Sequence, residues 1–323
     1  ITVAAAFPTT VAPIMQVGAV PVFVDIDIPS YNMDMSMLEK AYSNKTKAVF
    51  IAHSLGNPFN LKAAKEFCDS HNLWLIEDNC DGLGGTYELD GVTYKTGTIG
   101  DIGTSSFYPA HQMTMGEGGA VYSSNPLLHK IIRSMRDWGR ECVCTGGQDN
   151  LCGHRFDGQF GTLPAGYDHK YVYSHLGYNL KVTDMQAAIG AAQKLPGFVK
   201  ARQEHWDYLR AGLDDMKDYY ILPEKEKSSE PCWFGFILTV KPESGKNRNE
   251  IVKFLEDNNI QTRNLFAGNI TRHPCFEQFR EGVDYRIAVT DHVMNNRFWV
   301  GVYPGMTTPM LDEMIKKIKE AVQ

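Results

Sequence analysis

The feature that most constrains the fold is the alternation of β-rich runs and helical segments before residue 80. The apolar, β-prone runs are Val20–Asp27, Ala48–His53 and Leu73–Asp78. Helical spacing of apolar residues begins at Met35 and recurs over Leu61–Asn72. Strands separated by single helices predict a mostly parallel sheet with crossover helices, and therefore an α/β fold. Ligands of such sheets bind beyond the carboxyl ends of the strands.

Several chemically capable residues follow the predicted strands. Asp78 and His53 each end a run, and the segment Ser105–Gly119, SSFYPAHQMTMGEGG, places His111 on a loop beside a Gly-rich turn. Loops positioned by a rigid sheet often carry ligand-binding residues. Taken alone, however, a loop histidine is more often structural than functional, and an isolated strand-end aspartate more often caps a turn.

The second half of the chain predicts helices followed by a smaller α+β unit. Helices are expected after the N-caps Asn125 and Thr183, and a long amphipathic helix over residues 196–216 is expected to bridge two domains. Shorter strand and helix patterns follow it. We therefore predict a large domain over residues 1–200 and a small C-terminal domain over residues 201–323.

Composition narrows the functional classes. The chain has 323 residues, of which 43% are hydrophobic and 22% charged, and a net charge of −6 argues against general nucleic-acid binding. It has no apolar run long enough to span a membrane and no signal peptide, so a cytoplasmic protein is expected. Because the chain begins at Ile1 in an apolar segment, we expect that an N-terminal portion is missing.

Four of the seven cysteines form a candidate metal set. Cys142, Cys144 and Cys152 have the spacing C-x-C-x7-C within the long segment 141–178, and Cys80 lies near Asp78. Four thiolates can hold a zinc ion or a 2Fe–2S cluster. The spacing alone leaves zinc, iron–sulfur and no metal equally open. The odd cysteine count and uneven spacing do not suggest a secreted disulfide framework.

The segment around His111 resembles the cofactor-lysine segment of the DegT/DnrJ/EryC1/StrS sugar aminotransferases. Ser106-Phe107 and Gly116-Glu117-Gly118-Gly119 match that family's pattern, but His111 stands where those enzymes carry lysine. An imidazole cannot form the internal Schiff base of pyridoxal phosphate (PLP), although it can move a proton near neutral pH. The resemblance therefore implies the aspartate aminotransferase fold (fold type I) and the branch that uses pyridoxamine phosphate (PMP) for dehydration.

The resemblance also assigns roles to other positions. It implies that Asp78 pairs with the pyridine nitrogen, that Asp81 approaches the cofactor hydroxyl, and that Ser106 binds the cofactor phosphate. Phe7 would stack on the ring, unless it is an ordinary core residue. Asn179 would reach the phosphate of the neighbouring subunit in a homodimer, unless it only turns the chain before Thr183. The family's phosphate-cradling helix start would precede Ile1, and without it cofactor affinity would be poor.

His111 together with the four cysteines is similar to the iron–sulfur branch of the family. That likeness implies a 2Fe–2S cluster on Cys80, Cys142, Cys144 and Cys152, fed by an iron–sulfur flavin reductase. It implies C3 dehydration of a CDP-linked 4-keto-6-deoxy sugar for the 3,6-dideoxyhexoses of lipopolysaccharide O-antigen, with His111 removing a proton from cofactor C4′. The alternatives are a cluster-free PMP sugar 3-dehydratase and a non-catalytic binding protein of the same fold. An ordinary aminotransferase would need lysine at 111.

Overall fold

The computed structural model describes residues 1–144, 147–279 and 287–323. Its central sheet has the strand order β3-β4-β7-β8. Strands β3 (Ala48–Ala52), β4 (Trp74–Asp78) and β7 (Ile102–Ser106) are parallel, and β8 (Gly119–Tyr122) is antiparallel to β7. The predicted mostly parallel sheet is therefore confirmed, and Asp78 and Ser106 are the last residues of adjacent strands.

The crossover between β3 and β4 contains α3 (Leu61–His71). The Asn60 side chain caps its first turn by accepting a hydrogen bond from the Ala63 N–H at 3.0 Å, and Asn72 ends the helix in the left-handed conformation. Its buried side chains are Leu61, Ala64, Phe67 and Cys68. This is the amphipathic helix that the spacing of apolar residues predicts.

The N-terminal region differs from the prediction. Within the expected strand Val20–Asp27, β2 (Phe23–Val24) pairs in parallel with the short β1 (Thr2–Val3), and Ile26 forms an isolated antiparallel bridge with Met33. Between β1 and β2 lies α1 (Pro8–Gln16), which the sequence analysis did not predict. Phe7 is the residue at the N-cap of α1, so α1 begins directly beside a predicted site residue.

A second sheet, with the order β12-β13-β11-β9, is antiparallel and belongs to the C-terminal part. Its strands are β9 (Tyr220–Ile221), β11 (Gly235–Val240), β12 (Thr262–Arg263) and β13 (Arg297–Gly301). Helices α7 (Arg248–Asp257), α8 (Ala288–Asn296) and α9 (Thr308–Glu320) accompany it. A third, small sheet joins the hairpin β5 (Thr86–Leu89) and β6 (Val92–Lys95) to β10 (Ser229–Glu230). Helix α8 and the hairpin were not predicted.

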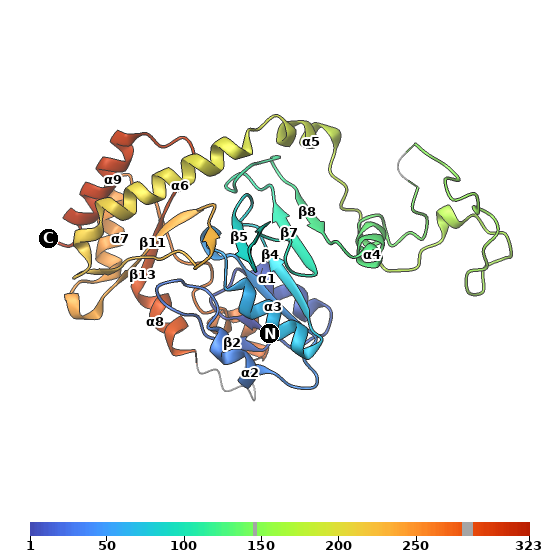
Figure 1. Cartoon of the computed structure of the whole chain (residues 1–323), viewed down its shortest axis with the longest axis horizontal. Helices are drawn as coiled ribbons and strands as arrows, with labels where there is room; N and C mark the ends of the chain where they lie inside the picture. Colours follow the sequence, from blue (N-terminus) through green and yellow to red (C-terminus); the bar gives the residue numbers. More distant parts are fainter. Residues whose placement is uncertain (145–146, 280–286) are drawn as a thin grey trace.

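The long helix α6 (Leu195–Gly212) runs along one side of the molecule from α5 toward the C-terminal helices (Figure 1). Buried apolar side chains form two clusters. One is built mainly from residues 1–99, with contributions from Ile237, Leu265, Ile270, Phe276 and Val293. The other lies within residues 206–322 and includes Trp206 and Leu209 of α6. The helix predicted to bridge two parts of the chain therefore contributes to the C-terminal core.

The chain between α4 (Pro126–Arg136) and α5 (Asp184–Ala191) projects away from the sheets (Figure 1). We call residues 137–182 the arm. Asn125 caps α4 and Thr183 forms a capping box with Gln186 at the start of α5, as the sequence predicts. The arm contains a single turn of 3-10 helix (His169–Tyr171) within its described residues.

The remaining short elements are α2 (Leu38–Ala41) and 3-10 turns at Met35–Met37, Ser54–Gly56, Asp214–Met216, Pro242–Ser244, Ile270–Arg272 and Pro274–Phe279. No helix of the described chain has the length and apolar character needed to cross a membrane.

Candidate functional site

The carboxylate of Asp78 is fixed at the end of β4 by three donors. Thr10 Oγ1 of α1 donates to Oδ2 at 2.7 Å, and the Cys80 N–H donates to Oδ1 at 3.1 Å. Thr104 Oγ1 of β7 lies 3.4 Å from Oδ1 and completes the set. With 7% of its surface exposed, Asp78 is a buried acid whose orientation is set by hydrogen bonds.

His111 and Asp81 lie next to each other. His111 Nδ1 is 3.4 Å from Asp81 Oδ1, and the second oxygen of Asp81 accepts the Leu55 N–H at 3.2 Å. The contact between the ring and the carboxylate lacks hydrogen-bond geometry, so the buried Nδ1 atom has no hydrogen-bond partner among the described residues. Burial raises the pKa of Asp81, and His111 opposes that shift. The negative charge of Asp78 raises the same pKa, which places the two carboxylates within electrostatic reach.

The loop that carries His111 is held in place by buried polar side chains. Gln112, which is 2% exposed, donates from Nε2 to the backbone carbonyls of Asp81 and of Cys232, the latter at 3.1 Å. The His111 ring packs on the Phe234 ring, with the centroids 5.3 Å apart. A cavity of about 560 Å³ adjoins the loop and is lined by His111, Phe198, Arg202, Phe234, Trp299 and Tyr303 among others.

Phe7 and Ser106 lie on elements that meet at Asp78. Phe7 precedes the helix that carries Thr10; its side chain is half exposed and its ring meets Phe266 edge-on, with centroids 6.0 Å apart. Ser106 ends β7, and its hydroxyl accepts the Tyr108 N–H at 3.2 Å. The structure thus places Phe7, Asp78, Asp81, Ser106 and His111 around the carboxyl end of the central sheet.

Asn179 lies elsewhere, on the exposed arm. It forms an isolated antiparallel bridge with Asp137, and its side-chain oxygen accepts a hydrogen bond from Lys181 Nζ at 2.7 Å. Among the described residues, it forms no hydrogen bond with those around Asp78. Its predicted role at a neighbouring subunit's cofactor stays a prediction.

The four predicted metal ligands are divided between two regions. Cys80 lies beside Asp78 in the body, by which we mean the described chain outside the arm. Burial, and then the Asp78 charge, raise the pKa of its thiol. Cys142 and Cys144 interact with each other on the arm. Cys152 is exposed, also on the arm, and its sulfur lies 3.7 Å from His169 Nε2. Among the described residues, no three His, Cys, Asp or Glu side chains are arranged to hold a metal ion. The metal set stays a prediction.

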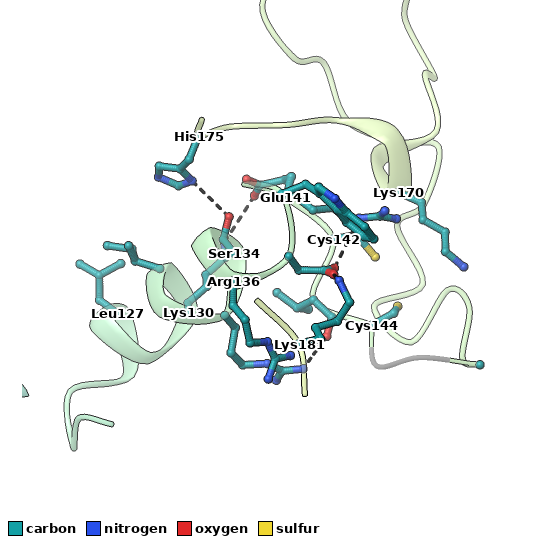
Figure 2. Close-up of a pocket in the computed structure, with 17 residues that line it drawn as sticks. Leu127, Lys130, Ser134, Arg136, Glu141, Cys142, Cys144, Lys170, His175 and Lys181 are labelled. Atoms are coloured by element: carbon teal, nitrogen blue, oxygen red, sulfur yellow. Dashed lines mark hydrogen bonds and ion pairs between the residues drawn. The ribbon is translucent and has the colours of Figure 1, made fainter. Parts of the chain in front are cut away.

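A second cavity, of about 550 Å³, lies between α4 and the arm (Figure 2). Cys142 and Cys144 lie on one side of it, and side chains of α4 line the other. Its lining is cationic, with six basic and two acidic side chains: Lys130, Arg133, Arg136, Arg140, Lys170 and Lys181 against Asp137 and Glu141. Lys181 Nζ pairs with Asp137 at 2.7 Å and lies 3.5 Å from the centroid of the Trp138 ring.

Sequence reasoning did not identify Thr10, Thr104, Gln112 or Arg202. The first three are uncharged polar residues that belong to no recognisable sequence motif. Arg202 carried a usable signal, because it occupies the buried stripe of α6 with Trp206 and Leu209. A cation in the apolar register of an amphipathic helix indicates a specific buried partner.

Comparison with known proteins identifies the class and then the family. The solved structure of the Escherichia coli GDP-4-keto-6-deoxy-D-mannose-3-dehydratase with bound hydrated PLP superposes with a TM-score of 0.84 at 26% identity, over 100% of this chain and 79% of that one. The fold is therefore that of the PLP-dependent transferases of fold type I, as predicted. The model of the DegT/DnrJ/EryC1/StrS aminotransferase family matches residues 1–319, and the chain belongs to that family.

Two curated relatives are similar over nearly the whole chain. The lipopolysaccharide biosynthesis protein RfbH of Salmonella typhimurium is 55% identical over 322 residues, which cover 99% of this chain and 73% of the relative. The dTDP-4-dehydro-2,6-dideoxy-D-glucose 3-dehydratase of Saccharopolyspora spinosa is 48% identical over 324 residues, which cover 100% of this chain and 69% of the relative.

Proposed function

We propose that this protein is a PMP-dependent 3-dehydratase of a nucleotide-linked 4-keto-6-deoxy sugar. The observation that carries the proposal is His111, which stands at the family's lysine position and lies 3.4 Å from the buried Asp81. A histidine there can move a proton but cannot anchor an aldehyde cofactor. The similarity to a 3-dehydratase at 48% identity supports the same reaction type.

The residues around Asp78 have the chemistry that a pyridine cofactor requires. Asp78 is a buried carboxylate held by three donors and suits a protonated ring nitrogen. The half-exposed Phe7 ring offers an aromatic face, and the Ser106 hydroxyl is a donor for a phosphate. The Nδ1 atom of the His111 ring faces the Asp81 carboxylate at 3.4 Å, which leaves the other ring nitrogen to act on a ligand. When bound, PMP would supply an amine that condenses with a ketone and a ring that accepts electron density.

The protein's own contribution is the handling of protons and charge. Asp78 would keep a proton on the ring nitrogen, because its carboxylate is oriented and paired in a low-dielectric setting. His111 would accept the proton from the carbon that bears the amine and would pass a proton to the departing C3 hydroxyl. Asp81 would stabilise the imidazolium that forms, since its charge lies beside Nδ1. Asp81 is thus proposed to act through His111, in place of a cofactor-hydroxyl contact.

The proposed substrate is CDP-4-keto-6-deoxy-D-glucose, also written CDP-6-deoxy-L-threo-D-glycero-4-hexulose. Its dehydration would lead to the 3,6-dideoxyhexoses of lipopolysaccharide O-antigen, which agrees with the similarity to a lipopolysaccharide biosynthesis protein. Relatives that act on dTDP- and GDP-linked sugars make the nucleotide a direct question for experiment. Turnover of the CDP-, dTDP- and GDP-linked ketosugars by one preparation would answer it.

The decisive variant is His111→Asn. We expect dehydration to fall by about 10³-fold, within the range for removal of a general base, while PMP binding measured by fluorescence titration stays within about threefold. His129→Asn, on the exposed face of α4, is the matched control and should retain wild-type turnover. Dehydration by His111→Asn at the wild-type rate would reject the assignment of His111.

We further propose the iron–sulfur branch, with a 2Fe–2S cluster and a separate iron–sulfur flavin reductase. Cys142, Cys144 and Cys152 lie on one arm and are donors of the type that such clusters use, while Cys80, the fourth predicted ligand, lies beside Asp78. The cluster-free dehydratase that deaminates its own product is the rival. Iron, sulfide and zinc analysis after anaerobic purification separates the two, and two iron and two sulfide per chain is the expected result. A metal-free protein that dehydrates the sugar would establish the rival.

A homodimer is part of the same proposal. The end of the arm and the start of α5 expose apolar side chains, from Leu176, which is 99% exposed, through Tyr178 and Leu180 to Met185. Such a surface usually meets another protein surface. Light scattering should give a mass of two chains, and Asn179→Asp should then weaken PMP binding by placing a negative charge near a phosphate. A monomer that binds PMP tightly would contradict the role of Asn179.

A further inference from the structure

Arg202 is a buried cation on the apolar face of α6. Its side chain is 3% exposed and shares a stripe with Trp206 and Leu209. No ion pair joins it to a carboxylate in the described part of the chain. Burial lowers the pKa of its guanidinium, and Cys232 and Asp81 act in the opposite direction. An arginine kept in such a place must be compensated by the groups it contacts, because an unpaired buried charge is costly.

Those groups are three backbone carbonyls from three separate segments. Arg202 Nη1 donates to the Trp233 carbonyl at 3.0 Å and also to that of Val302, and Nη2 donates to the His111 carbonyl at 3.4 Å. Trp233 lies two residues before β11, and Val302 immediately follows β13, its neighbour in the sheet. One side chain therefore connects the His111 loop to two adjacent strands of the second sheet.

Phe234, the residue after Trp233, contacts the His111 ring directly. The guanidinium carbon of Arg202 lies 6.0 Å from the centroid of the Phe234 ring, and that ring packs on His111. The Phe234 N–H donates to the Leu55 carbonyl at 2.8 Å, and the Leu55 N–H binds Asp81. The imidazole thus lies between the Asp81 carboxylate and the Phe234 ring. Leu55 binds both of these residues and so links them to the segment that Arg202 holds.

We infer that Arg202 is a positioning residue for His111: Arg202 holds the His111 loop so that the imidazole stays between Asp81 and Phe234. The inference rests on the proposed function, since it assigns Arg202 an effect on the proton transfer by His111. Lysine cannot replace it, because an ammonium group is a compact point donor while the planar guanidinium spans carbonyls in different directions. A displacement of about 1 Å at a catalytic group can cost about 10²-fold in rate.

The test compares Arg202→Lys and Arg202→Gln with Gln203→Met. Gln203 is the next residue of α6, and its Nε2 donates to the Pro231 carbonyl at 3.0 Å, so it holds the same segment but does not touch the His111 loop. We expect both Arg202 variants to lower kcat by about 10²-fold with KM within about threefold, and Gln203→Met to leave both unchanged. Only variants with a native circular dichroism spectrum are assayed. The test therefore needs just one of the two Arg202 variants to fold.

Hydrogen exchange of the cofactor-free protein supplies a readout that needs no turnover. The reporter amides are those of His111 and Met115, which donate to the Tyr108 and Phe107 carbonyls within the loop. We expect both to exchange roughly tenfold faster in the Arg202 variants, the change expected for loss of about one hydrogen bond, and at the wild-type rate in Gln203→Met.

The two readouts separate the inference from the proposed function. An inactive wild-type protein would end the proposed function, while faster exchange confined to the Arg202 variants would still establish that Arg202 holds the loop. Wild-type exchange in the Arg202 variants would overturn the inference. Equal losses in Gln203→Met would overturn it as well, because they would indicate general packing of α6.

Discussion

The residues around His111 and those around Cys142 are both rich in polar groups, but the two regions are packed differently. Near His111 the polar side chains are buried and bind backbone groups of distant segments, as Gln112 and Arg202 do. On the arm the charged side chains are partly or fully exposed and several pair with one another within the arm, as Lys170 does with Asp149. Buried hydrogen bonds hold a fixed geometry, because breaking them costs much free energy. Exposed ion pairs contribute little to the stability of the fold.

This difference has a functional consequence. A base that must meet a reacting carbon needs a geometry determined by its surroundings, and the buried contacts around His111 would provide it for the proposed proton transfer. The arm has few buried residues of its own and carries a cationic cavity and an exposed apolar segment. Such a surface is suited to packing against a partner molecule, and the second copy of the chain proposed above would be that partner.

The largest expected effect comes from Glu77→Gln. The Glu77 side chain is fully buried and accepts the N–H groups of Gly97, Ile99 and Gly100 at 2.6–2.7 Å, and His53 Nε2 at 2.9 Å. We expect a loss of about 3 kcal/mol in the free energy of unfolding at pH 7, because removal of the charge weakens four bonds at once. Chemical denaturation measures it.

The pH dependence of that loss follows from the pKa of Glu77. Burial alone would raise this pKa, but His53 and the backbone donors hold it below the usual value. The stabilisation is therefore fully present above the unfolded-state pKa of about 4.3 and disappears as the pH falls through the lower folded-state value. Glu141→Gln on the arm is the control and should change stability by less than about 0.5 kcal/mol. Equal losses in both variants would remove the distinction between the two regions.

The second effect is confined to the arm. Gly139 has a φ of +79°, and a Cβ built there would lie only 1.8 Å from the His175 carbonyl oxygen. We expect Gly139→Ala to destabilise the arm locally by about 2 kcal/mol, since the strained backbone and the overlap must both be relieved. Proteolysis within the arm should accelerate while the melting temperature of the body stays constant. Gly147→Ala is the control, because it also has a positive φ but meets no neighbouring atom. A lower melting temperature for the body would show that the arm and the body unfold together.

Sequence patterns predicted those parts of the fold that local chemistry determines. The parallel strands and the caps at Asn125 and Thr183 follow from periodicity and side-chain hydrogen bonding. Helix α1 was missed because Pro8, Pro13 and two threonines read as a turn or strand, although proline is favourable in a first turn. The hairpin β5–β6 had a readable signal in Asp90-Gly91, both with positive φ, and it was overlooked.

The site was predicted where a motif existed and missed where only tertiary contacts define it. Asp78, Ser106 and His111 were predicted from the family pattern, and the structure places them at one end of the sheet. Thr10 and Gln112 could not be found, because their partners lie 68 residues away in the case of Thr10, and 31 and 120 residues away in the case of Gln112. Sequence spacing carries no information about which distant carbonyl or carboxylate a buried side chain will meet.

The smallest effect has the opposite sign. Burial raises the pKa of Asp81, so its charged form costs stability in the folded state. We expect Asp81→Asn to stabilise the protein by about 1 kcal/mol at pH 8 while lowering turnover about 10²-fold, since an amide cannot support the imidazolium. The gain should be complete above the raised folded-state pKa and should disappear as the pH falls below the unfolded-state value of about 3.9.

Asp81→Asn also sharpens the comparison with Glu77, which lies four residues earlier and is likewise a buried acid. Glu77 has a full set of donors, so its charge stabilises the fold; Asp81 has one backbone donor and a ring nitrogen without hydrogen-bond geometry, so its charge opposes folding. A carboxylate kept charged against the stability of the fold is typical of a functional site. Melting temperatures of both variants across pH 4–8 should therefore move in opposite directions from the wild type. If Asp81→Asn lost stability at pH 8, Asp81 would be a structural acid like Glu77, and its assigned support of His111 would lose its energetic basis.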